Sequence, residues 1–214
     1  MRPITVGVGP LAAASANNIA LSQTPGAAGA LTLNGSLVVG GVAILDNPRR
    51  ILITTADSTH VFTVNGLTPT GAFITETVAA NGTSAFTAQD FAKVTSITIN
   101  GAATAAVTVG TNGIAATPWV RLDEWANTQV AIQIDVTGTV NYTVQSTLDD
   151  PNSATNPVLP QNVTWITTND TNVVGAAQSL QTNYLFSPTY ARVLLNSGTG
   201  SCTATFVQAN VANR

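Results

Sequence analysis

Hydrophobic and polar residues alternate with a period of two along much of the chain, most clearly in VAIQIDVTGTVNYTVQS, residues 130–146. The apolar residues on one side are Val130, Ile132, Ile134 and Val136, followed after Thr137-Gly138 by Val140, Tyr142 and Val144. Because successive side chains of a strand point to opposite faces, this pattern predicts two half-buried strands joined by a tight turn.

The same alternation recurs in shorter stretches of the first half of the chain. VTSITINGAATAAVTVGTNG, residues 94–113, predicts two strands around a turn at Asn100-Gly101. The expected strands are 41–45, 50–55, 60–64, 72–78, 94–100 and 104–110. We expect a helical turn at TAQDFAK, residues 87–93. The spacing of the strands favours a small antiparallel sandwich over 41–116.

A second sandwich is expected over 117–214, beginning near TPWVRLDEW. After the two strands of 130–146 comes a long connection, DDPNSATNPVLPQN, residues 149–162. VTWIT, YARVLLN and SCTATFVQ then supply further strands. Short strands with one long crossover are typical of a Greek-key or jelly-roll arrangement.

Residues 1–40 have few large apolar side chains with which to form a core of their own. Although Ala14-Ser15-Ala16 resembles a cleavage site, Pro3 and Pro10 interrupt the apolar run that a signal peptide would need. We therefore expect an extended N-terminal arm that is held by the body of the protein or by a neighbour.

Composition supports an ordered all-β protein with an unusual surface. Hydrophobic residues make up 44% of the 214 residues and charged residues only 8%, which is the opposite of a disordered chain. The formal net charge of −3 and scattered cations disfavour direct nucleic-acid binding. No apolar run is long enough to cross a bilayer. A surface with so few charges is expected to be covered by other protein, as in a homo-oligomer.

Reactive side chains are scarce, and we expect no catalytic, cofactor-binding or metal-binding set. The only histidine, His60, shares a strand face with Phe62 and Val64, which favours a satisfied or partly exposed side chain over a catalytic base. The only cysteine, Cys202, shares a face with Ala204 in CTATF and is expected to be a buried apolar residue.

The paired carboxylates also have simple interpretations. Adjacent residues of a strand point to opposite faces, so Asp123-Glu124 and Asp149-Asp150 do not form a glycosidase pair. The second pair could donate oxygens to calcium, but an Asp that initiates a turn is the favoured interpretation. Glu76 is expected to be an exposed strand charge.

Tryptophans could stack on sugars, and three are present: Trp119, Trp125 and Trp165. Trp119 and Trp165 lie in apolar strand segments, however, where core packing is expected. Glycosylation sequons begin at Asn34, Asn81, Asn141, Asn162 and Asn169. In a chain so rich in threonine such sequons arise by chance, and we infer no glycosylation.

From about residue 41 onward the chain resembles virion structural proteins of tailed double-stranded-DNA bacteriophages. The stretches that carry the resemblance are RRILITTADSTHVFTVNG, ITETVAANGTSAFTAQDFAKVTSITINGAATAAVTVGTNG, TPWVRLDEW and VAIQIDVTGTVNYTVQSTLDDP. The resemblance implies a capsid decoration or cement protein, often trimeric, that binds the major capsid protein or other virion proteins. It also implies a location in the virion, after assembly in the cytoplasm of the bacterial host.

Two structural alternatives and one remote alternative stay open. The chain could be a receptor-binding or glycan-binding module of the tail, collar or head fibre, or it could be a head-to-tail connector or tail component. An enzyme is disfavoured, because one histidine and few carboxylates leave little to assign.

Overall fold

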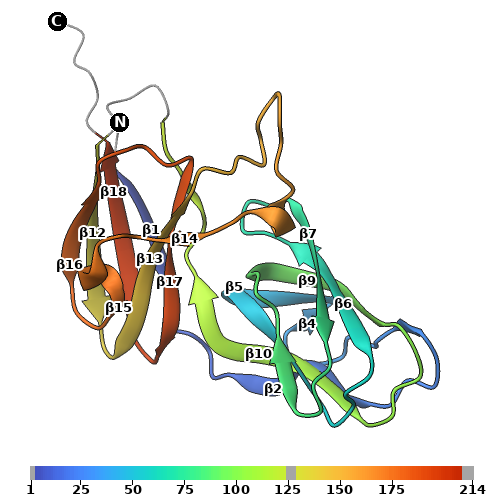
Figure 1. Cartoon of the computed structure of the whole chain (residues 1–214). Coiled ribbons are helices and arrows are strands. Elements are labelled where there is room, and N and C mark those ends of the chain that lie inside the picture. The colour runs from blue at the N-terminus through green and yellow to red at the C-terminus, as the bar shows by residue number, and fades with distance from the viewer. Residues whose placement is uncertain (1–2, 124–128, 209–214) are drawn as a thin grey trace, which may run out of the picture. The chain divides into compact units, whose positions relative to one another are not determined.

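The computed structural model describes residues 3–123 and 129–208, and it shows an all-β protein with antiparallel strand pairs (Figure 1). The contacts divide the chain into two compact units. Unit 1 combines Met1–Leu11 with Ile114–Arg214, and unit 2 is Ala12–Gly113. Sequence analysis expected one boundary between residues 116 and 117. The chain instead passes between the units twice, at Leu11–Ala12 and at Gly113–Ile114.

The described residues of unit 1 form two sheets and two 3-10 turns. One sheet has the order β1-β18-β12-β16, made of β1 (Ile4–Val8), β18 (Ser201–Gln208), β12 (Val130–Thr137) and β16 (Leu180–Tyr184). In the other, β13 (Val140–Thr147) pairs with β17 (Tyr190–Gly198), β14 (Ile166–Thr167) and β15 (Val174–Ala176). β17 also pairs with β11 (Val120–Arg121) and with the end of β10 (Val107–Ala116). The turns are η1 (Pro160–Asn162) and η2 (Thr171–Val173).

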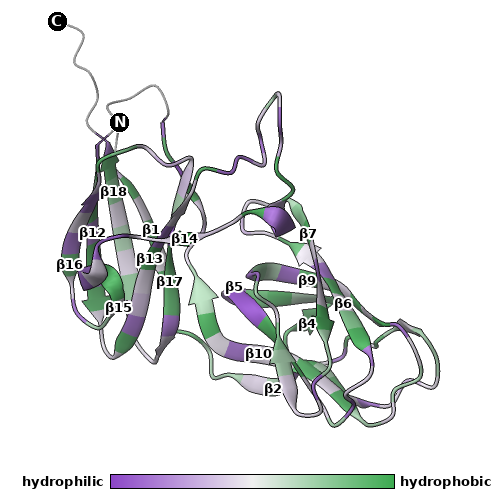
Figure 2. Ribbon diagram, viewed as in Figure 1, coloured by the Kyte–Doolittle hydropathy of each residue, from purple (hydrophilic) through white to green (hydrophobic). Residues whose placement is uncertain are grey.

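The inward faces of these two sheets share one hydrophobic core (Figure 2). β12 and β18 contribute alternate residues from one sheet, and β13 and β17 contribute residues from the other. The predicted inward residues of β12 and β13 lie in or against this core, which confirms the strand faces. The Greek-key or jelly-roll connection order stays a prediction.

The pairing expected between residues 130–136 and 140–144 is wrong. β12 pairs with β16 and β18, whereas β13 pairs with strands of the other sheet. The two-residue connection at Gly138-Thr139 therefore crosses from one sheet to the other. Alternation shows only which face of a strand is apolar. Two strands that lie in facing sheets have the same alternation as two strands of one hairpin.

Unit 2 is built around the strand order β10-β5-β9-β6-β7. The strands are β5 (Val42–Thr55), β6 (Val61–Leu67), β7 (Phe73–Ala79), β9 (Phe91–Ile99) and the first part of β10. β2 (Ser15–Gln23) pairs with β10, and β3 (Gly29–Ala30) pairs with β9. β4 (Val38–Val39) and β8 (Ser84–Phe86) pair with β5. Phe62, Val64 and Ile97 are fully buried in its core.

Three further expectations for the first half differ from the structure. Residues 3–40 pair with strands of the body of the protein, as expected, but they do not form one separate arm, because β1 pairs with β18 in unit 1 while β2, β3 and β4 belong to unit 2. The strands around Asn100-Gly101 are not neighbours, since β5 lies between β9 and β10 in the sheet. The predicted strands 41–45 and 50–55 lie, apart from Gly41, in the single strand β5.

The helical turn expected at 87–93 is also absent, because residues 87–90 form a bend before β9. The Glu76 carboxylate accepts hydrogen bonds from the N–H groups of Ala88 (2.6 Å) and Gln89 (2.9 Å). The Thr87 hydroxyl donates to the Gln89 carbonyl (2.8 Å). These bonds satisfy the backbone without a helical turn. Glu76 therefore fixes the bend rather than standing as a free surface charge.

Candidate functional site

A pocket of about 440 Å³ opens in unit 1. Its lining comes from the end of β13, from the segment around β14, and from the end of β16 with the residues that follow. The lining residues are Ser146, Ile166, Thr167, Thr168, Asn169, Asp170, Asn183, Tyr184, Leu185 and Phe186. Ser146 and Tyr184 belong to the two sheets that share the core, so the pocket lies where that core ends.

Buried hydroxyl groups form the inner part of this pocket. Ser146 follows Tyr142 and Val144 on the inward face of β13, so the apolar series there ends in a polar residue. Tyr184 is 4% exposed, and its hydroxyl has no hydrogen-bond partner of normal geometry among the described residues. Burial raises the pKa of Tyr184, and the nearby Ser146 and Thr168 hydroxyls oppose this rise. The phenol therefore stays protonated and able to donate.

Asp170 lines the pocket, and its carboxylate already accepts hydrogen bonds within the protein. Its Oδ2 accepts a hydrogen bond from the Thr182 hydroxyl (2.6 Å), and its Oδ1 accepts one from the Asn172 N–H (3.0 Å) at the start of η2. These bonds, the one from Thr182 first, lower the pKa of Asp170. The carboxylate is thus a structural group that holds η2 and β16 together.

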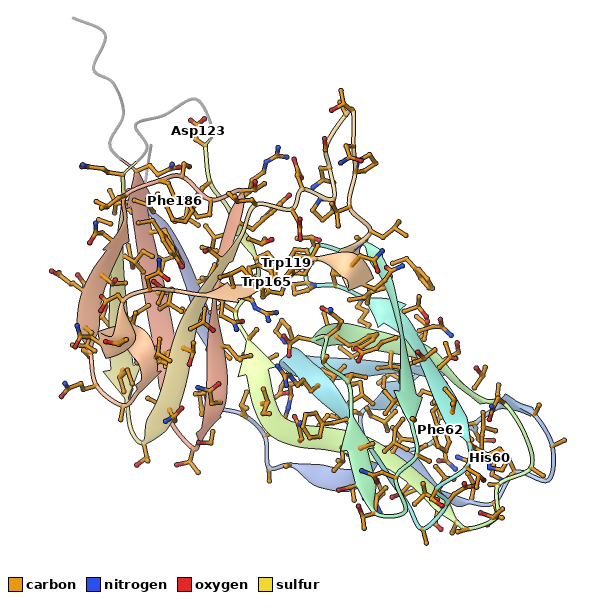
Figure 3. The ribbon with its side chains drawn as sticks, in the orientation of Figure 1. His60, Phe62, Trp119, Asp123, Trp165 and Phe186 are labelled. Carbon is orange, nitrogen blue, oxygen red and sulfur yellow. The ribbon has the colours of Figure 1, made fainter. Side chains whose placement is uncertain are left out.

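The outer part of the pocket is apolar. Ile166, Leu185 and Phe186 are 59%, 74% and 47% exposed, respectively. The Phe186 ring lies 5.4 Å from the Tyr184 ring at an interplanar angle of 56°. Phe186 lies at the same end of unit 1 as Asp123, whose carbonyl accepts a hydrogen bond from the Ser187 hydroxyl (Figure 3). An exposed ring above buried hydroxyls suits a ligand with one apolar and one polar side.

Sequence analysis named one of these lining residues, Asn169, and only as the start of a sequon, although two signals of the pocket were present. The alternating series of β13 ends in Ser146, and two consecutive apolar residues, Leu185-Phe186, follow the alternating segment of β16. Neither signal predicts which other segments line the pocket, because the lining residues come from positions 146, 166–170 and 183–186.

Two of the three tryptophans pack against each other. The Trp119 and Trp165 rings are 5.2 Å apart in an edge arrangement, and Tyr190 lies 6.0 Å from Trp119 (Figure 3). The guanidinium of the buried Arg192 lies 4.2 Å from the centre of the Trp165 ring. Sequence analysis expected both tryptophans in the core, and this is wrong, because both are half-buried and lie outside the core cluster. Arg192 occupies one face of Trp165, and Trp125 lies outside the described residues.

His60 has a partner and is partly exposed, as expected, but it lies just before β6 rather than within a strand. Its Nδ1 is 2.7 Å from Oδ2 of the buried Asp57, and Gly101 lies against the other side of the ring, at Nε2. Asp57 also accepts backbone hydrogen bonds from Thr59 (2.8 Å) and Thr104 (2.9 Å). The bond from Thr104 and then that from Thr59 hold the pKa of Asp57 far below its usual range.

The buried position predicted for Cys202 is confirmed. It is fully buried between the sheets of unit 1, and burial raises the pKa of its thiol to about 11. A thiol in this state is a poor nucleophile at neutral pH.

Asp149 and Asp150 each have partners in their own surroundings. Asp150 accepts a hydrogen bond from the Asn152 N–H (2.8 Å) and pairs with Arg121 (3.2 Å), which confirms the turn interpretation. Asp149 accepts from the Thr164 N–H (2.7 Å). Glu124 lies outside the described residues. Within residues 3–123 and 129–208 no three His, Cys, Asp or Glu side chains gather as a metal site would require.

Several sequon asparagines also hold the backbone. Asn34 accepts a hydrogen bond from the Leu21 N–H (2.9 Å), and Asn141 donates to the Gly175 carbonyl (3.0 Å). Asn81 accepts from the Thr83 N–H (3.1 Å). Asn162 lies in η1, and Asn169 lines the pocket. These roles give the sequons a local structural use.

In the part of the chain that the structure describes, no helix is long and apolar enough to span a membrane. Comparison with known proteins found no matching family model, no matching curated protein and no matching solved structure.

Proposed function

We propose that this protein is a non-enzymatic structural component of a bacteriophage virion, of the capsid decoration or cement type. It would act by binding copies of itself and other virion proteins through repeated surface contacts. The proposal rests on the sequence resemblance and on one structural observation, the amount of apolar side chain that both units expose.

Large apolar residues lie on the surface of each unit, in a chain with only 17 Asp, Glu, Lys and Arg residues. In unit 2 they are Leu21, Val39, Ile44, Phe73 and Phe86, and in unit 1 they are Leu148, Leu159, Ile166, Val174, Leu185, Phe186 and Val207. Such side chains gain free energy when a partner covers them, about 25 cal/mol per Å² of apolar area. An interface of standard size buries about 1,600 Å², enough for specific binding, and symmetry repeats it.

Copy number tests the decoration role directly. Quantitative mass spectrometry of purified particles of the encoding phage is expected to find on the order of hundreds of copies per particle. Light scattering of the purified protein is expected to give a trimer. A protein that is absent from mature particles, or that stays monomeric and does not bind capsid shells, would contradict the proposal.

The same exposed residues allow a matched test of the interface. Phe73→Ser and Phe86→Ser are expected to weaken self-association or shell binding, because each removes an exposed aromatic side chain from unit 2. Thr203→Ser, on the exposed face of β18, removes only a methyl group and serves as the control. Equal binding by all three variants would exclude these aromatic residues from the interface.

The pocket of unit 1 favours a second candidate, a receptor-binding or glycan-binding module of the tail, collar or head fibre. A few to a few dozen copies per particle would support this role over decoration.

A further inference from the structure

The pocket between the ends of β13, β14 and β16 contains polar groups that the fold itself does not use fully. Tyr184 is more than nine-tenths buried and lines the pocket, yet its hydroxyl lacks a normal hydrogen bond among the described residues. The hydroxyls of Ser146 and Thr168 lie near it. A buried polar group without a partner is costly, which favours a ligand that brings a hydrogen-bonding group to this position.

The charges of the lining restrict the ligand further. Among the described residues that line the pocket there is no Lys, Arg or His, so these residues offer no counter-ion to a phosphate, sulfate or carboxylate. Asp170, the acid among the described lining residues, already accepts hydrogen bonds from Thr182 and Asn172, so it has little need of a cationic partner. The remaining polar lining is uncharged hydroxyl and amide. This chemistry matches a neutral ligand rich in hydroxyl groups.

The outer wall adds a platform for an apolar face. Phe186 exposes about half of its side chain, and its ring inclines toward Tyr184. Sugar rings carry a face of C–H groups that packs on aromatic rings, while their hydroxyls point outward from the edge. The pocket volume of about 440 Å³ lies in the range of roughly 300–1,000 Å³ that is typical of small-molecule sites.

We propose that this pocket binds a neutral hexose residue of a glycan. The C–H face of the sugar lies on Phe186, and its hydroxyls exchange hydrogen bonds with Tyr184, Ser146 and Thr168. An apolar side chain of a partner protein fits less well, because it would cover these hydroxyls without pairing them. The inference is independent of the decoration role and would apply equally to a tail or collar protein.

Saturation-transfer NMR with the full-length protein tests the site. The probes are methyl glycosides of glucose, mannose, galactose and N-acetylglucosamine, with glucuronic acid and N-acetylneuraminic acid as charged comparisons. We expect signal from at least one neutral glycoside at millimolar concentration, and weaker signal from the acids.

Variants assign the signal to the pocket. Phe186→Ala is expected to weaken binding about tenfold through loss of the stacking surface. Tyr184→Phe keeps the ring and removes only the hydroxyl, and it is expected to weaken binding by a similar factor, about five- to tenfold. Thr77→Ala changes an exposed residue of β7 in unit 2 and is expected to leave binding unchanged.

Circular dichroism and thermal unfolding of each variant separate lost binding from lost folding. The proposal fails if no neutral glycoside binds, or if folded Phe186→Ala binds as well as the parent protein. It also fails if Phe186→Ala changes the oligomeric mass while no sugar binds, because the pocket would then be a protein contact.

Discussion

Arg49 shows how one buried charged residue can organise the interior of unit 2. Its side chain is 1% exposed and is the largest fully buried side chain of the described residues. The guanidinium donates to the Asp46 carboxylate (3.2 Å), to the Ala12 carbonyl (2.9 Å) and to the Asn112 carbonyl. Ala12 and Asn112 lie at the two places where the chain enters or leaves unit 2. Arg49 thus fixes the chain at both of these positions.

Replacement of Arg49 tests this role. Arg49→Met is expected to destabilise unit 2 by about 3 kcal/mol, because methionine makes none of the hydrogen bonds that the guanidinium donates to one carboxylate and two carbonyls. Urea denaturation measures the change. Arg121→Met is the control, since Arg121 pairs with Asp150 but is 52% exposed, and it is expected to change stability by less than about 1 kcal/mol. Similar losses in the two variants would contradict the role of Arg49.

The single residue Asp57 makes the stability of unit 2 depend on pH. Its folded-state pKa lies below the ordinary value of 3.8, because Thr104 and Thr59 donate backbone hydrogen bonds to the charged form. The stabilisation is therefore complete above the unfolded pKa and is lost as the pH falls below about 4 toward the folded pKa.

Thermal unfolding between about pH 7 and pH 2 measures this contribution. Asp57→Asn is expected to lower the melting temperature at neutral pH and to flatten its decline on acidification. Asp135→Asn changes an exposed carboxylate of unit 1 and is expected to leave the profile of unit 2 as it is. A profile that Asp57→Asn leaves unchanged would argue against this hydrogen-bond network.

At the scale of elements, two short connections cross between the sheets of unit 1 and lie against each other. One joins β12 to β13 and the other joins β17 to β18. The Thr139 carbonyl accepts hydrogen bonds from the N–H groups of Thr199 (3.0 Å) and Gly200 (2.9 Å). Gly138 has a φ of 77°, and a Cβ added at Gly200 would collide with the Thr137 carbonyl. Glycine is required here by backbone conformation at one position and by close approach at the other.

Gly200→Ala is expected to destabilise unit 1 by about 2 kcal/mol, because one of the two connections must move. Gly26→Ala is the control, since a Cβ added there meets nothing within 4 Å. It is expected to be neutral or slightly stabilising. Chemical denaturation compares the two, and an undisturbed Gly200→Ala protein would show that the connections do not need their close contact.

Some features of the strands that these connections join could be predicted from the sequence, and others could not. The residues that β12 and β13 turn inward were predicted from alternation, because burial of one strand face leaves a period of two in the sequence. Their placement in different sheets was not predicted, since a short connection looks the same within a sheet and between sheets. The bend at 87–90 was missed for a related reason, because the Glu76 carboxylate that fixes it is distant in sequence.

At the scale of the whole molecule, the two units differ in chain continuity. Unit 2 is one segment, Ala12–Gly113, whereas unit 1 needs β1 from the N-terminus to pair with β18 over five residues. β1 also supplies Val8 to the core of unit 1. The stability of unit 1 therefore depends on residues that are separated from the rest of the unit by about a hundred positions in sequence.

Fragments test this difference. Residues 12–113 alone are expected to fold cooperatively and to give dispersed NMR signals, because their core is complete. Residues 114–214 alone are expected to be less stable than unit 1 in the full chain, and a peptide of residues 1–11 is expected to restore stability when added. A fragment 114–214 that is as stable without the peptide would show that β1 contributes little.

The sequence alone determined the all-β class, the inward residues of the strands, the burial of Cys202 and the turn at Asp149-Asp150, because each depends on neighbours a few residues away. Tertiary structure decided which strands pair, how residues 3–40 divide between the units, and where Ser146, Thr168, Tyr184 and Phe186 form one pocket. These features depend on contacts between distant segments, and a local period of two is compatible with many such arrangements.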